Sequence, residues 1–155
     1  MSNGQAPGSG PGIHVPNLLL VEDSQDDVVI TQRALARAHI GNHLTVASDG
    51  KQALDLLYAD AMDGRERFGL VLLDLGLPKI DGREVLKRIW GDRRLRHIPV
   101  IVLTTSNDER DVEACYLAGA NSYIQKPVDM EGFLRAIERL KGYWFEVVVL
   151  PRGVA

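Results

Sequence analysis

Short apolar runs alternate with longer stretches of helical period along most of the chain. The apolar runs cover residues 18–21, 44–47, 70–73, 100–103 and 122–124. Runs of this length between polar segments predict strands. The first, third and fourth runs are apolar at every position, which is typical of central parallel strands covered by helices on both faces.

Apolar residues between these runs fall on helical stripes, which we expect to pack against the sheet. The stripes comprise Ala53, Leu54, Leu57, Tyr58 and Ala61, then Val85, Leu86, Ile89 and Trp90, and finally Phe133, Ile137 and Leu140. Ser24, with Asp27 three residues later, and Asp49, with Gln52, are suited to cap helix starts. Residues 60–68 resemble an insertion and predict a longer loop or an extended helix.

Alternating strands and helices predict an α/β fold with a parallel sheet. Right-handed crossovers then give a doubly wound, five-stranded sheet of flavodoxin-like order 2-1-3-4-5. In such a fold the functional site lies at the carboxyl ends of the strands.

The two ends of the chain differ from the predicted domain, which spans residues 17–142. Residues 1–16 are rich in Gly, Pro and Ser and predict a flexible tail. Residues 143–155 include aromatic and β-branched residues of strand character, which predict a strand-like extension. We expect this extension to pair two protomers into a homodimer, although it could instead fold back on its own domain. The predicted dimer contacts are Trp144, Phe145, Val147 and Val149.

Length and charge limit the classes of partner. The chain has 155 residues, of which 45% are hydrophobic, enough for one domain with its own core. With 18 basic and 21 acidic residues its formal net charge is −3, so there is no overall positive field to attract nucleic acid or anionic lipid. The basic run at residues 93–97 could contact an acidic partner or nucleic acid, but short runs like it are usually solvated. We therefore expect protein partners.

The compartment is predicted from what the sequence lacks. The single cysteine, Cys115, cannot form an internal disulfide, and no signal peptide is apparent. No apolar stretch approaches the roughly 20 residues needed to cross a bilayer. We expect a cytoplasmic protein.

The residues that follow the predicted strands carry the candidate chemistry. Glu22 and Asp23 follow the first strand, Asp74 the third, Thr104 the fourth and Lys126 the fifth. Parallel topology brings these strand ends to one edge of the sheet. Carboxylates about 4 Å apart repel by roughly 4 kcal/mol at an effective dielectric near 20, so a cation is needed. Mg²⁺ suits this site, because it combines one or two carboxylates with waters and a phosphate.

These residue types fit phosphoryl transfer. A metal ion and Lys126 would neutralise the oxygens of a phosphoryl group, and Thr104 would donate a hydrogen bond to one of them. Asp74 would then be the nucleophile and form an acyl phosphate.

Four motifs in this order resemble a response-regulator receiver domain, a match that runs from about residue 17 to 140. They are Val21-Glu22-Asp23-Ser24, the stretch from Leu73-Asp74 to Asp81-Gly82, Leu103-Thr104-Thr105 and Lys126-Pro127. Each motif alone is weak, and an acid at a strand end can simply cap a helix, but four in order form a specific signal.

The resemblance implies roles for individual residues. Asp74 would take phosphate from a phosphohistidine of a sensor histidine kinase. Asp23, Asp74 and the carbonyl of Gly76 would ligate Mg²⁺, with Glu22 acting through water. Thr104 and Tyr123 would form the switch pair. The family also implies a cis peptide between Lys126 and Pro127.

The C-terminal extension, which ends in Leu150-Pro151, resembles single-domain receivers that partner phytochrome-type histidine kinases. The kinase could therefore be a phytochrome. Because only residues 152–155 follow Leu150-Pro151, we expect output through protein contacts. The chain would then be no enzyme in the usual sense and would catalyse only its own phosphorylation and dephosphorylation.

Three other functions compete with this interpretation. A haloacid-dehalogenase-type phosphohydrolase needs a second acid two positions after its nucleophile, whereas Ser24 and Gln25 occupy those positions here. A flavin carrier needs a phosphate loop after the first strand, where Glu22 and Asp23 would repel phosphate. A receiver-like scaffold that is never phosphorylated remains open.

Overall fold

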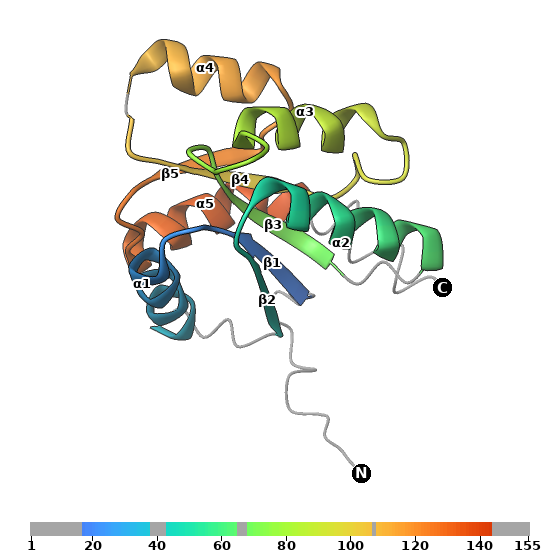
Figure 1. The fold of residues 1–155 in the computed structure, drawn as a ribbon. Coiled ribbons are helices and arrows are strands. Elements are labelled where there is room, and N and C mark those ends of the chain that lie inside the picture. The colour runs from blue at the N-terminus through green and yellow to red at the C-terminus, as the bar shows by residue number, and fades with distance from the viewer. Residues whose placement is uncertain (1–16, 38–42, 65–67, 107, 144–155) are drawn as a thin grey trace.

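Five parallel strands form the centre of the molecule in a computed structural model that describes residues 17–37, 43–64, 68–106 and 108–143 (Figure 1). They are β1 (Asn17–Val21), β2 (Leu44–Ala47), β3 (Phe68–Asp74), β4 (Val100–Thr104) and β5 (Ser122–Gln125). Their order is β2-β1-β3-β4-β5, and all four neighbouring pairs are parallel. The predicted strands and sheet order are confirmed.

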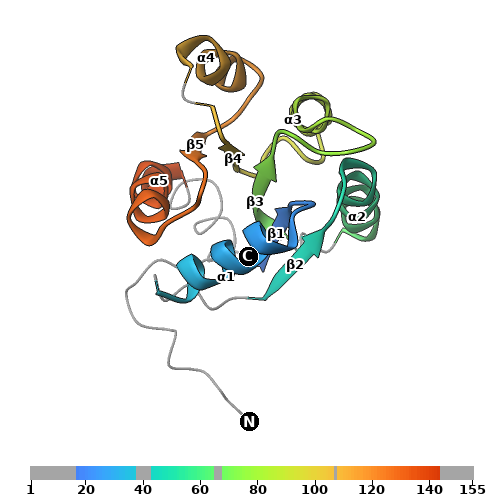
Figure 2. The same ribbon diagram turned by 60° about the vertical axis from the view of Figure 1, so that its left-hand side comes forward.

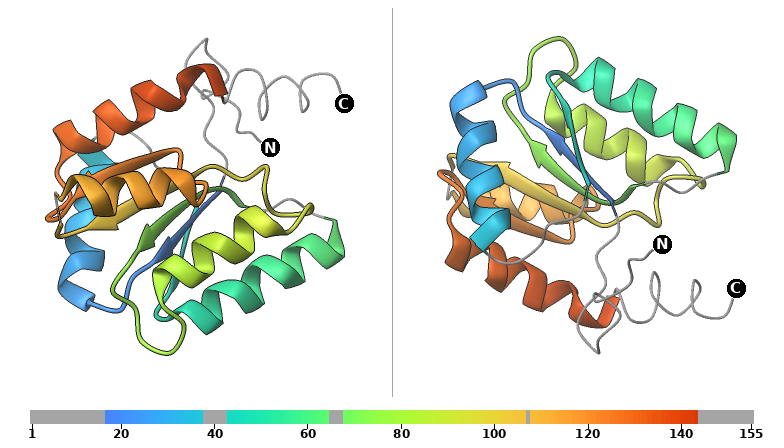
Figure 3. Two further views of the ribbon diagram at one scale, coloured as in Figure 1. Left: turned by 90° about the horizontal axis from the view of Figure 1, so that it is seen from above. Right: turned by 90° about the horizontal axis from the view of Figure 1, so that it is seen from below.

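Helices cover both faces of this sheet. They are α1 (Gln25–Arg37), α2 (Gly50–Asp63), α3 (Gly82–Gly91), α4 (Glu109–Leu117) and α5 (Met130–Tyr143). α2, α3 and α4 lie on one side, while α1 and α5 lie on the other (Figures 2 and 3). Among the helices within the described residues, none is long and apolar enough to cross a membrane.

The alternation of side chains along each strand produces two separate cores. On β3, Val71 and Leu73 belong to the core under α2 and α3, whereas Leu70 and Leu72 belong to the core under α1 and α5. A strand that is buried on both faces needs an apolar residue at every position. This requirement explains the continuous apolar runs in the sequence.

The predicted helical stripes pack as expected, with one exception. Residues such as Leu57 and Ile89 are buried against the sheet, but Trp90 is 52% exposed. Trp90 lies at the margin of its stripe and packs against the turn at Gly119. A Cβ placed on Gly119 would lie 3.0 Å from the Trp90 side chain. The side chains of Ile137 and Leu140 lie outside the described set.

The stretch at residues 60–68 is divided between two elements. α2 continues to Asp63, and Gly64 caps it in the left-handed conformation at φ 68°. β3 then begins at Phe68, whose N–H donates to Asp60 Oδ2 at 3.3 Å. The prediction of an extended helix is therefore confirmed for residues 60–63. The predicted tail at residues 1–16 and the extension from residue 144 onward lie outside the described residues.

Candidate functional site

Three carboxylates meet at the carboxyl edge of the sheet. Glu22 and Asp23 follow β1, and Asp74 is the last residue of β3. One oxygen from each lies within 4.8 Å of the others, close enough for the three groups to hold a metal ion. Glu22 and Asp74 are buried and Asp23 is exposed, so the trio opens to solvent on the Asp23 side. The predicted acidic cluster is thereby brought together.

Lys126, which follows β5, reaches into this cluster. Its Nζ lies 2.9 Å from Glu22 Oε1, 3.5 Å from Asp74 Oδ1 and 2.7 Å from Asp27 Oδ2. Burial alone would lower the pKa of Lys126, but the contacts with Asp27 and Glu22, together with the charge of Asp74, raise that pKa overall. The ammonium is therefore held in its charged form.

Glu22 is only 1% exposed and is held from two directions. Its Oε2 accepts from the N–H of Ser24 at 3.2 Å, and Oε1 faces Lys126. Burial is the main cause that raises the pKa of Glu22, and the charge of Asp74 adds to it, while Lys126 and Ser24 oppose the rise. Burial thus makes Glu22 costly to keep ionised without a nearby cation.

Asp27 is a site residue that sequence reasoning missed. The sequence predicted only a capping role with Ser24, and the Asp27 N–H does donate to Ser24 Oγ at 3.3 Å. The carboxylate of Asp27 also makes the shortest contact of Lys126. A signal was available, because Asp27 lies in the first turn of α1, directly after the Glu22-Asp23 strand end.

Thr104 ends β4 beside the lysine segment. Its carbonyl accepts from the N–H of Lys126 at 2.7 Å, and its Oγ1 accepts from the N–H of Ser106 at 3.0 Å. Thr104 as a whole is buried at the same edge of the sheet. The peptide bond between Lys126 and Pro127 is cis, as the family resemblance implied.

Tyr123 lies half-buried on β5, on the side of the sheet covered by α4. Its ring meets that of Tyr116 edge to face, with centroids 6.1 Å apart. The structure thus places Tyr123 between the core and α4.

The loop after β3 has open space around Gly76 and is tightly packed at Gly82. The Gly76 N–H donates to Asp74 Oδ1 at 3.3 Å, and nothing lies within 4 Å of a Cβ placed on Gly76. A Cβ on Gly82, at the start of α3, would lie 2.3 Å from the carbonyl oxygen of Asp74. Only glycine at position 82 lets the helix begin this close to the strand end.

The charge of the site favours a cation. The ammonium of Lys126 is paired with the carboxylates of Glu22, Asp27 and Asp74, and Asp23 adds a fourth carboxylate beside Glu22 and Asp74. Carboxylate oxygens are the donors that Mg²⁺ and similar hard cations prefer. The donor set therefore fits a divalent ion, and Asp74 combines a nucleophilic carboxylate with a nearby fixed positive charge.

A family model decides between the competing functions. The model of the response regulator receiver domain matches residues 18–138. The chain belongs to this family. As a receiver domain, it acts as a phosphoacceptor in two-component signalling. The family excludes the phosphohydrolase and flavin-carrier alternatives, which have different residues after the first strand.

Similar proteins include both phytochrome-associated and other regulators. The chain is 39% identical over 135 residues to response regulator Rcp1 of Synechocystis, covering 86% of this chain and 92% of Rcp1. It is 43% identical over 127 residues to a probable methanogenesis regulatory protein, FilR2, of Methanothrix harundinacea, covering 82% of each. The solved structure of the bacteriophytochrome response regulator AtBRR is 40% identical, with a TM-score of 0.73, covering 83% of this receiver and 94% of that chain. A solved form of Rcp1 contains Mn²⁺, with 37% identity, a TM-score of 0.65 and coverage of 86% and 96%.

Proposed function

We propose that Asp74 is the phosphoacceptor and that it takes its phosphoryl group from a phosphohistidine of a sensor histidine kinase. The observation that carries this assignment is the position of Asp74 at the end of β3, with Oδ1 3.5 Å from Lys126 Nζ and with Glu22 and Asp23 beside it. In the reaction, an oxygen of Asp74 forms a bond to phosphorus while the phosphorus–nitrogen bond of the phosphohistidine breaks. The kinase imidazole leaves with the electron pair of that bond.

Lys126 and Thr104 would stabilise the transferring group. The ammonium of Lys126 is already held beside Asp74, so it can bind a phosphoryl oxygen with little rearrangement. The Thr104 hydroxyl accepts from Ser106 and keeps its own proton free to donate to a second oxygen. These two donors favour the transition state, in which charge spreads over the equatorial oxygens.

The divalent ion in this proposal is Mg²⁺, held by Asp23, Asp74 and the Gly76 carbonyl, with Glu22 acting through water. When bound, it would supply positive charge to the phosphoryl oxygens. The surplus of carboxylates over the single lysine supports this assignment. Mn²⁺ in the solved form of Rcp1 also favours a divalent cation, although it leaves Mg²⁺ as the proposal for this chain.

Thr104 and Tyr123 would form the switch. Movement of the Thr104 hydroxyl toward a phosphoryl group would vacate space beside β5, and the Tyr123 ring would turn inward. The Tyr123 ring now meets the Tyr116 ring of α4 edge to face, and this contact would break when the Tyr123 ring turns inward. The surface around α4 and β5 would change in this way and signal to protein partners.

The kinase is proposed to be a phytochrome, because Rcp1 and AtBRR are similar over most of the chain and AtBRR is a bacteriophytochrome response regulator. We also propose a cytoplasmic homodimer whose contacts include Trp144, Phe145, Val147 and Val149. These residues lie outside the described part of the structure, so the sequence alone supports their assignment.

Intact mass spectrometry tests the phosphoacceptor. Wild type and Asp74→Asn are incubated with acetyl phosphate, with and without Mg²⁺. We expect one phosphate adduct on the wild type in the presence of Mg²⁺ and none on the variant. Asp81→Asn, which removes an exposed carboxylate from the same loop, serves as the control and should still form the adduct. A wild type without adduct under every condition would favour the scaffold alternative.

Sizing of the same samples tests the dimer. The full chain and a chain ending at Tyr143 are compared by light scattering, before and after phosphorylation. A dimer of the full chain that becomes monomeric on truncation would support the extension as the contact. A truncated chain that remains dimeric would contradict this assignment without affecting the phosphoacceptor.

A further inference from the structure

A chain of hydrogen bonds joins the Thr104 hydroxyl to helix α4 through a single residue, Ser106. The Ser106 N–H donates to Thr104 Oγ1 at 3.0 Å. The Ser106 hydroxyl donates to Asp111 Oδ2 at 2.9 Å and accepts from the N–H of Asp108 at 3.1 Å. The backbone of Ser106 is therefore bonded to the end of β4, while its side chain is bonded to the first turn of α4.

Helix α4 is only lightly anchored to the core. Of its residues, all within the described part of the chain, only Cys115 is buried. The neighbouring helix α3 buries four residues by comparison. A helix with few buried apolar contacts belongs to the less stable part of a fold and shifts at low cost. The polar bonds at the first turn of α4 therefore contribute a large share of what fixes its position.

Movement of the Thr104 hydroxyl toward a phosphoryl group would disturb this chain of bonds. If Thr104 moves alone, its bond with the Ser106 N–H breaks. If Ser106 follows, its hydroxyl leaves Asp111, unless α4 follows as well and changes its own packing. Each case loses a contact that is present without phosphate, so the chain of bonds stabilises the unphosphorylated state relative to the phosphorylated one.

We infer that Asp111 is a positioning residue that restrains the Thr104 hydroxyl through Ser106 and couples its movement to α4. This role rests on the proposed function, because it requires Thr104 to bind the phosphoryl group. Without the Asp111 carboxylate, Ser106 would follow Thr104 without losing a bond to α4. The phosphoryl group would then be bound more tightly, and α4 would no longer be held in its unphosphorylated position.

Capping of α4 does not require the bond from Ser106 to Asp111. Asp108 is the residue that caps this helix, and its carboxylate accepts from the N–H of Arg110 at 2.8 Å. An acid in the first turn also interacts favourably with the helix dipole, but Glu109 supplies the same charge there. The capping of the helix therefore leaves the Asp111 bond without a structural role of its own.

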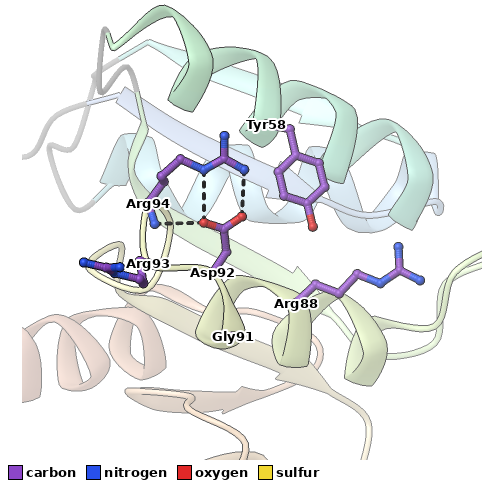
Figure 4. Close-up of a pocket in the computed structure, with 6 residues that line it drawn as sticks. All are labelled: Tyr58, Arg88, Gly91, Asp92, Arg93 and Arg94. Atoms are coloured by element: carbon purple, nitrogen blue, oxygen red, sulfur yellow. Dashed lines mark hydrogen bonds and ion pairs between the residues drawn. The ribbon is translucent and has the colours of Figure 1, made fainter.

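Asp92, in the turn after α3, shows what purely local bonding looks like. Its carboxylate accepts from the N–H of Arg94 at 2.8 Å and from the Nε and Nη2 of the same residue at 3.2 and 2.9 Å (Figure 4). These bonds stabilise one turn. Asp111 differs because its partner, Ser106, is also bonded to the Thr104 hydroxyl.

Equilibrium binding of beryllofluoride, an analogue of a phosphoryl group, tests the inference in the full chain at saturating Mg²⁺. Asp111→Ala should bind beryllofluoride about fivefold more tightly than the wild type, the factor that one ordinary hydrogen bond contributes. Asp111→Asn keeps an oxygen that can accept from Ser106 and should lie closer to the wild type. Glu109→Gln, which removes a charge from the same turn, and Asp92→Ala, which removes the local bonds after α3, should leave the affinity unchanged.

Ser106→Ala removes the same bond from its other end and should give a similar gain in affinity. Because the two residues act through one bond, the double variant Ser106→Ala, Asp111→Ala should gain no more than either single variant. In NMR spectra without beryllofluoride, the amide signals of residues 109–117 in Asp111→Ala should already lie part of the way toward their positions in the wild-type complex. A residue that only stabilised the fold would change urea unfolding without either effect.

Two kinds of failure are distinguishable. Unchanged or weaker affinity in Asp111→Ala, or the same gain in the Glu109→Gln and Asp92→Ala controls, would overturn the inference and leave the phosphoacceptor assignment intact. A wild type that binds beryllofluoride no better than Asp74→Asn would instead contradict the proposed function, and the role of Asp111 would fall with it.

Discussion

Lys126 and Asp27 form the shortest ion pair around Asp74 among the described residues, with Nζ 2.7 Å from Oδ2. The same ammonium lies 3.5 Å from Asp74 Oδ1. Asp27 therefore holds the lysine close to Asp74 but also competes with any phosphoryl group for it. We therefore expect Asp27 to influence how readily the receiver is phosphorylated.

Asp27→Asn is expected to increase the extent of phosphorylation by acetyl phosphate at saturating Mg²⁺ by about fivefold. Loss of one unit charge near a partly solvated site changes the electrostatic energy by on the order of 1 kcal/mol, and here the change favours an incoming phosphate. Intact mass against time measures the effect. Asp26→Asn removes the same charge from an exposed neighbour in α1 and should have little effect. Reduced phosphorylation of Asp27→Asn would show that positioning of the lysine matters more than competition for it.

A divalent cation should stabilise the folded chain through the carboxylate trio. At a free Mg²⁺ concentration ten times its Kd, the free energy of unfolding should rise by about 1.4 kcal/mol. Asp23→Asn should lose most of this increase, because it removes one of the three carboxylates that can share the ion. Urea unfolding with Mg²⁺ or with a chelator measures it. Asp26→Asn should respond to Mg²⁺ as the wild type does, and an unchanged response in Asp23→Asn would place the ion elsewhere.

The strands and the sheet order were predictable because their physical causes are local. A strand such as β3, buried on both faces, must be apolar throughout, and this pattern is visible without any tertiary information. Right-handed crossovers then allow only a few strand orders.

Trp90 illustrates where this reasoning fails. The helical period places it at the margin of a stripe, and only the position of α4 decides whether anything covers it.

Residues of the site that follow strand ends were also predictable, since topology alone brings them together. Glu22, Asp74 and Lys126 converge as expected. Asp27 was missed, because its role depends on the distance its side chain spans from α1 to Lys126.

Glu22 should give the receiver a distinctive pH dependence of stability in the absence of metal. Burial raises its pKa above the ordinary value of 4.5, so the folded state binds this proton more tightly than the unfolded state. The resulting stabilisation is present below pH 4.5 and is lost as the pH rises through the folded-state pKa. Glu22→Gln cannot titrate and should therefore become progressively more stable than wild type as the pH rises from 4 toward the folded-state pKa of Glu22, with the difference constant above it.

Urea unfolding of both proteins with a chelator, at intervals across this pH range, measures the difference. Glu131→Gln removes an exposed carboxylate from the first turn of α5 and serves as the control for a lost charge. If Glu22→Gln and wild type differed by a constant amount at every pH, Glu22 would not be the group responsible.

Gly82 should be far less tolerant of a methyl group than Gly76, although both lie in the loop region after Asp74. A Cβ at position 82 would lie 2.3 Å from the Asp74 carbonyl oxygen and 2.6 Å from Leu75 Cα, and both are backbone atoms that cannot move independently. At position 76 a Cβ would meet nothing within 4 Å. We expect Gly82→Ala to lower the free energy of unfolding by about 1–3 kcal/mol, as overpacking does, and Gly76→Ala to change it by less than about 0.5 kcal/mol. Helix propensity alone would favour alanine at position 82 by roughly 1 kcal/mol, so the sign of the change in urea unfolding separates the two effects. A stabilised Gly82→Ala would mean that α3 can shift away from the phosphoacceptor without cost.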